Sequence, residues 1–154
     1  MTATIPTLTW AQVPRPLRLL ARWITIAQAA GYGVSLAFAR QMASRFDNLS
    51  GTDSHELLLS AHSHLLGMTA LFALSGACYA LCSKPKEPLR SAAIVSPFAA
   101  IMTAFTAVWL MRFSPAFSVL LLTAHIVMAV TFYYQIIITL RELRAVRKAE
   151  SSTR

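Results

Sequence analysis

The chain has 154 residues, of which 56% are hydrophobic and only 13% are charged. A soluble domain of this size has about one-quarter charged residues and interrupts its apolar runs every few positions, whereas here the charges gather in short clusters between long apolar stretches. The composition excludes an ordinary soluble domain and predicts an integral membrane protein whose main partner is the lipid bilayer.

Four apolar stretches are predicted to be membrane helices, since roughly 20 helical residues cross the hydrocarbon layer. We therefore expect an all-α fold, a single membrane domain built as a four-helix bundle. The first stretch is the weakest because Gln28, glycines and a serine dilute it. The spans cover approximately residues 23–39, 57–82, 92–111 and 116–140, and residues 141–154 follow as a helical extension that frays into a cytoplasmic tail.

Proline residues mark the lead-in to the first span and two of the connections between spans. The N-terminal segment does not resemble a cleaved signal peptide, because its arginines come after residue 14 and no small-residue cleavage site follows a short apolar core. Pro14 and Pro16 predict an extended lead-in to the first span. The loop "SKPKEP" between the second and third spans predicts antiparallel neighbours, and Pro115 suits the first turn of the fourth span.

The net charge of +8 is explained by topology. Eleven basic residues lie on one side of the predicted spans, against Arg40, Arg45 and Arg112 on the other. The positive-inside rule then places both termini and the "SKPKEP" loop in the cytoplasm, in a bacterial-type inner membrane, and no nucleic acid is expected as a partner. The eleven are Arg15, Arg18, Arg22, Lys84, Lys86, Arg90, Arg141, Arg144, Arg147, Lys148 and Arg154.

Several other side chains have ordinary membrane roles. Trp23 and Trp109 fall at predicted span ends, as in an aromatic interfacial belt. Cys78 and Cys82 are one helical turn apart, and two thiols without further ligands make a poor metal site, so they are interpreted as small buried hydrophobic residues. Tyr133 and Tyr134 are interpreted as packing residues.

Three histidines lie inside the predicted spans, where ionisable residues usually face the protein interior, a partner or a cofactor. With a rise of about 1.5 Å per residue, His62 and His64 lie roughly 8 to 10 Å below the external surface and His125 roughly 14 Å below it. Histidines from two helices therefore share one layer. Because His62 and His64 point some 200° apart around a helix, they are expected to have separate roles and not to clamp one metal ion.

This layer has room for a flat macrocycle. Gly31 and Gly33 lie at the same depth on the first span, and Gly67 lies one turn below His64, although small residues also let helices pack closely. Cofactors in four-helix bundles are commonly held by facing side chains, so a b-type haem between His64 and His125 would fit. The external Arg112, with Arg40 and Arg45, could pair with haem propionates, or anchor the helices at the interface.

Copper is the alternative cofactor. His62, His64, His125 and Met68, with Met128, supply imidazole and thioether ligands, which suit copper better than magnesium or calcium. No Asp or Glu lies inside a predicted span to complete an anionic ligand set. A third interpretation needs no cofactor, because neutral imidazoles can bond to carbonyls or hydroxyls of neighbouring helices.

The segment "AHSHLLGM", residues 61–68, resembles the H-x-H-x-x-G-M-like stretch of small four-span bacterial membrane proteins of uncharacterised function. Over part of one span it is also similar to a histidine-bearing helix of haem-copper oxidase catalytic subunits and of nitric-oxide-response membrane proteins with oxidase-like helices. The resemblance implies that His62 or His64 ligates haem or a metal. The chain has too few spans and histidines for a complete oxygen-reducing centre in one copy.

These observations predict a small haem-binding or metal-binding protein that acts in electron transfer or in gas or redox sensing, with His64 and His125 as the preferred ligands and His62 as the alternate one. Hydrolytic chemistry is disfavoured, because neither a nucleophile–base pair nor a carboxylate acid and base is evident. Two alternatives stay open: a non-catalytic accessory subunit of a larger membrane complex or a homo-oligomer, and a copper or small-solute transporter that uses His62 and Met68.

Overall fold

All regular structure in the described part of the chain is helical. The computed structural model describes the backbone of residues 8–43 and 54–152 and the side chains of residues 8–34 and 64–152. Over these ranges the all-α prediction, with four long helices, is confirmed. In chain order the elements are η1 (Trp10–Gln12), α1 (Arg15–Ala43), α2 (Ser54–Ala80), α3 (Leu89–Leu110), η3 (Pro115–Phe117) and α4 (Ser118–Ser152).

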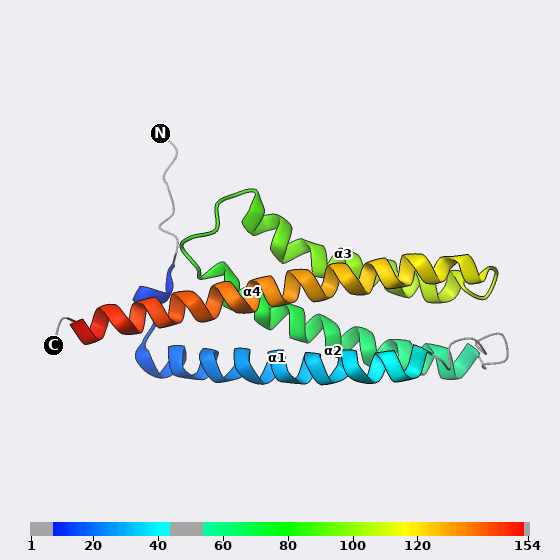
Figure 1. Cartoon of the computed structure of the whole chain (residues 1–154), viewed down its shortest axis with the longest axis horizontal. Coiled ribbons are helices and arrows are strands. Elements are labelled where there is room, and N and C mark those ends of the chain that lie inside the picture. Colours follow the sequence, from blue (N-terminus) through cyan, green and yellow to red (C-terminus); the bar gives the residue numbers. More distant parts are fainter. Residues whose placement is uncertain (1–7, 44–53, 153–154) are drawn as a thin grey trace.

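The four long helices lie along one another in alternating directions (Figure 1). The start of α1, the α2–α3 loop and the end of α4 lie together at one end of the molecule, and the α3–α4 turn lies at the other. We call the first the basic end, because it holds Lys84, Lys86 and Arg90 together with the arginines that end α4. We call the second the histidine end, because His64 and His125 lie in the halves of α2 and α4 nearest to it.

The lengths and surfaces of the helices suit a membrane. In the described residues, α3 and the segment Pro115–Ser152 are long and apolar enough to cross one, and His64–Ala80 is a shorter apolar helix. Large apolar side chains such as Val95, Leu122 and Val130 are exposed on the outer faces. At about 1.5 Å per residue the 35 residues of α4 exceed the roughly 30 Å of hydrocarbon, so this helix projects beyond it.

Among the described side chains, two clusters of buried residues follow one another along the bundle. The central cluster is aromatic: Tyr32, Phe72 and Phe132 meet there, with ring centroids 4.8 Å apart for Tyr32 and Phe132. The second cluster lies at the basic end and includes Trp10, Cys78, Tyr79, Cys82 and Leu143. The burial of both cysteines agrees with their interpretation as small hydrophobic residues.

The first helix and its lead-in differ from the sequence-based prediction. Helix α1 begins at Arg15, eight residues before the predicted span, because Pro16 falls in the first turn, where the missing N–H of a proline costs nothing. The preceding residues form the short turn η1 and not only an extended lead-in. Trp10 is 2% exposed, and its backbone N–H donates to Leu81 O at 3.2 Å, so the lead-in is anchored to the end of α2.

The last helix also continues further than its predicted span. Helix α4 runs unbroken to Ser152, and Glu142 and Leu143 are buried in it. Near its end Glu150 forms an ion pair with Arg18 of α1. The region predicted as a helical extension is therefore part of the bundle at least as far as Leu143, because its apolar and acidic side chains find partners on α1 and the α2–α3 loop.

Candidate functional site

His125 has a defined orientation on α4. Its side chain is half-buried, and Nδ1 lies 2.8 Å from the carbonyl oxygen of Leu121, one turn earlier in the same helix. A carbonyl can only accept, so Nδ1–H is the donor and Nε2 carries the lone pair. This arrangement, in which one ring nitrogen donates to a carbonyl and the other is left as a ligand, is the usual one for metal-bound histidine.

His64 lies on the edge of the face that α2 turns toward the interior. Its side chain is exposed, while the neighbouring Leu65 and Met68 pack against the central cluster. The backbone of α2 is helical through residues 62 to 64. The side chains of His62 and His55 lie outside the described residues.

The three predicted glycines differ in their surroundings. A Cβ at Gly33 would lie 3.2 Å from the hydroxyl of Tyr133, so this glycine permits the close approach of α1 and α4. At Gly31 and Gly67 a Cβ would meet no atom within 4 Å, and both residues are exposed. The predicted role in close helix packing therefore fits Gly33, whereas Gly31 and Gly67 lie on exposed surface where an added Cβ would meet nothing.

The external arginine Arg112 lies at the α3–α4 turn, with its guanidinium carbon 5.7 Å from the centre of the Trp109 ring. This cation–π contact is typical of an interfacial anchor. Its side chain is exposed, so it can still turn toward an anionic group. The other two predicted external arginines, Arg40 and Arg45, have side chains outside the described residues.

The methionines considered for copper belong to the interior. Met128 is 1% exposed within the central cluster, and Met68 packs against the same cluster. Among side chains 8–34 and 64–152, no group of three or more His, Cys, Asp or Glu is placed to hold a metal ion. Both methionine side chains are therefore in contact with the central cluster.

Residues 52–150 match the family of transmembrane helical domains named Aq_1264_TM. The chain belongs to this family. No curated protein and no solved structure matches the chain. The matched region of the transmembrane helical domain contains α2, α3 and nearly all of α4, and therefore both His64 and His125, while α1 precedes it.

The transmembrane helical domain also holds a polar cluster at the basic end that the sequence analysis did not single out. Gln135, Thr139 and Glu142 follow one another at helical spacing on α4 and are all buried. The Gln135 amide donates to Ala93 O of α3 at 2.6 Å, and Glu142 accepts from the Ser83 N–H at 2.7 Å. The i, i+4, i+7 spacing of these polar residues was the available signal.

The same cluster bonds the loop that follows α2. Arg90 donates from Nη2 to Cys82 O at 2.6 Å, and the Cys82 thiol lies 3.7 Å from the Thr139 hydroxyl. Arg90 therefore joins the α2–α3 loop to the start of α3, and Glu142 joins the same loop to α4. This cluster is a structural latch of the domain, with polar groups bonded mainly to backbone.

Proposed function

We propose that the chain is a four-span protein of a bacterial-type inner membrane, with the basic end in the cytoplasm. The support is the gathering of most basic residues at the end that holds the α2–α3 loop and the end of α4 (Figure 1), since basic loops remain on the cytoplasmic side. A reporter active only in the cytoplasm, fused after Arg154, should be active. An inactive reporter in a correctly inserted protein would contradict this orientation.

We further propose that the protein binds one b-type haem in the external half of the bundle, through His64 of α2 and His125 of α4. The observation that carries this proposal is the bond from His125 Nδ1–H to Leu121 O, which leaves Nε2 as the free coordinating nitrogen of an oriented imidazole. A haem carries its own four nitrogen ligands, so two side chains are enough to complete its coordination.

The other residues of this layer fit the same group. Gly31 and Gly67 leave open space at their Cβ positions, and His62 is the alternate ligand on the second face of α2. Arg112, exposed at the α3–α4 turn, would bind a propionate by bidentate hydrogen bonds. When bound, the haem would supply a one-electron redox centre, or a binding position for a diatomic gas where the gas displaces one of the two histidines, and the apolar helices would exclude water from it.

The test is the optical spectrum and metal content of protein purified from cells supplied with a haem precursor. We expect a Soret band that is lost in His64→Ala and His125→Ala. His55→Ala is the matched control, because His55 precedes the predicted span, and it should retain the band. A folded protein without a Soret band would overturn the haem proposal, and stoichiometric copper in its place would favour the metal alternative.

A non-catalytic accessory subunit is the second candidate. The observation that favours it is the same bond, because His125 already has a partner within its own helix and needs no cofactor to satisfy one ring nitrogen. This candidate predicts a spectrally silent protein that is recovered with a stoichiometric partner chain, and it predicts that His125→Ala does not weaken the association.

A further inference from the structure

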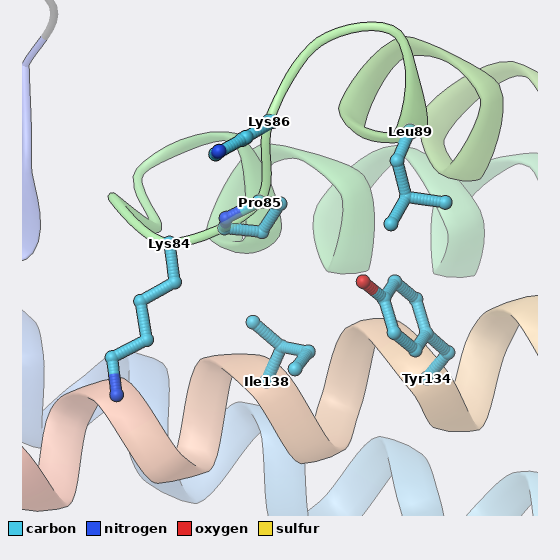
Figure 2. Close-up of a pocket in the computed structure, with 6 residues that line it drawn as sticks. All are labelled: Lys84, Pro85, Lys86, Leu89, Tyr134 and Ile138. Atoms are coloured by element: carbon cyan, nitrogen blue, oxygen red, sulfur yellow. The ribbon is translucent and has the colours of Figure 1, made fainter.

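An open hollow lies at the basic end, between the α2–α3 loop and α4. It has a volume of about 370 Å³. Figure 2 shows three of its residues on the loop, one at the start of α3 and two on α4, with the Tyr134 hydroxyl directed toward the loop. The lining residues are Lys84, Pro85, Lys86, Leu89, Tyr134 and Ile138.

The hollow combines an apolar floor with a cationic rim. Leu89, Tyr134 and Ile138 form the apolar part, and Lys84 and Lys86 are exposed on the loop above it. Lys84 extends from the loop toward α4, whereas Lys86 projects to one side (Figure 2). A ligand with an anionic head and a hydrocarbon tail is complementary to this arrangement.

The nearby carboxylates do not neutralise the rim. Glu87, in the same loop, accepts from Ser91 and lies 4.0 Å from Arg90 Nε. Glu142 is buried and accepts from Ser83. Arg141 is exposed and follows Ile138 by three positions, so it adds a further positive charge on the same side of α4.

The depth of the hollow matches the boundary between headgroups and hydrocarbon. The lysines lie in the loop outside the helices, and Ile138 lies within two residues of the predicted end of the fourth span. Tyr134 is one turn deeper, about 6 Å further along α4. Basic pockets between membrane helices at this level are suited to anionic lipid headgroups.

We propose that this hollow is a binding site for one anionic glycerophospholipid. Lys84 and Lys86 bind its phosphate and headgroup, and one acyl chain lies along Leu89, Tyr134 and Ile138. The site uses no histidine and lies at the end of the bundle opposite the proposed haem layer. Lipid binding there can therefore be tested whether or not the protein binds a haem.

Native mass spectrometry of delipidated, detergent-solubilised full-length protein tests the site. Dioleoyl phosphatidylglycerol should bind as one tight molecule, roughly 10-fold or more tighter than dioleoyl phosphatidylcholine. The Lys84→Ala/Lys86→Ala double variant should weaken the first phosphatidylglycerol by about 10- to 30-fold, as two headgroup contacts of ordinary size would. Ile138→Trp, which fills the hollow without changing its charge, should also abolish the tight molecule.

The matched control is Arg147→Ala/Lys148→Ala, which removes the same charge from exposed positions further along α4 and should change the affinity by less than about twofold. An equal loss in both double variants would overturn the site, because it would mean attraction to diffuse charge only. Equal binding of the two lipids, displacement by inorganic phosphate in tenfold excess, or unchanged binding in a folded Ile138→Trp protein would overturn it as well.

Discussion

At the basic end of the bundle, polar side chains join different elements, whereas His125 and Thr123, in the half of α4 nearer the histidine end, bond within their own helix. Glu142 joins α4 to the α2–α3 loop, Gln135 joins α4 to α3, and Arg18 pairs with Glu150. By contrast, His125 and the hydroxyl of Thr123 donate to carbonyls one turn earlier in α4. The printed bonds of the basic end therefore connect separate elements, whereas those of His125 and Thr123 leave the contacts between helices to other side chains.

A substitution in the aromatic cluster between the two ends should lower the free energy of unfolding the most. Phe132 is fully buried and contacts the rings of Tyr32, Phe72 and Tyr133. Phe132→Ala should lower the free energy of unfolding by about 3 kcal/mol, the low end of the usual cost, since lipid reduces the transfer term. Detergent-based equilibrium unfolding measures it.

Val130→Ala is the control for this substitution, because Val130 is exposed on the same helix and should change stability by less than about 0.5 kcal/mol. Equal losses in the two variants would contradict the assignment of Phe132 to the interior.

Removal of the latch carboxylate should have the next largest effect. Glu142→Ala removes the acceptor of the N–H and hydroxyl of Ser83; because Ser83 is exposed and can bond to water instead, the cost should be about 1 kcal/mol. Glu142→Gln keeps an acceptor oxygen and should recover at least half of the loss. Unfolding measurements together with limited proteolysis in the α2–α3 loop follow both effects.

The comparison between the ends would fail if Glu142→Ala left the loop as resistant to protease as it is in the unchanged protein. It would be sharpened if cleavage appeared in this loop while the haem spectrum was retained, because the two ends would then respond independently.

At the histidine end, the loss of a polar side chain should change the free energy of unfolding little and should instead abolish cofactor binding. In protein without cofactor, His125→Phe should change the free energy of unfolding by about 0.6 kcal/mol or less, the usual size of a polar contact between membrane side chains, since its bond stays within one helix. The same substitution should abolish the Soret band. A loss of several kcal/mol without cofactor would instead make His125 a structural residue like Glu142.

The sequence predicted what depends on single helices and missed what depends on the folding of loops. Four long helices in alternating directions follow from the lengths and order of the apolar stretches. The burial of Glu142 depends on the α2–α3 loop returning over α4, and the anchoring of Trp10 depends on the position of Leu81. Neither is local, so Glu142, which follows the last apolar stretch, was placed in the helical extension beyond the fourth span.

The smallest expected effect is a difference in stability between alanine substitutions at Gly31 and Gly33, which lie two residues apart on α1. Gly33→Ala places a Cβ 3.2 Å from the Tyr133 hydroxyl, which donates to Ala29 O. The strain should cancel the gain of roughly 0.5 to 1 kcal/mol that alanine brings to a helix interior. Gly31→Ala meets open space and should keep that gain.

Adding Tyr133→Phe should restore the gain at position 33, because it removes the crowded oxygen. Equal stabilities for the two single variants, measured by thermal unfolding in detergent, would mean that α1 and α4 can separate slightly here, and Gly33 would then not be needed for their approach.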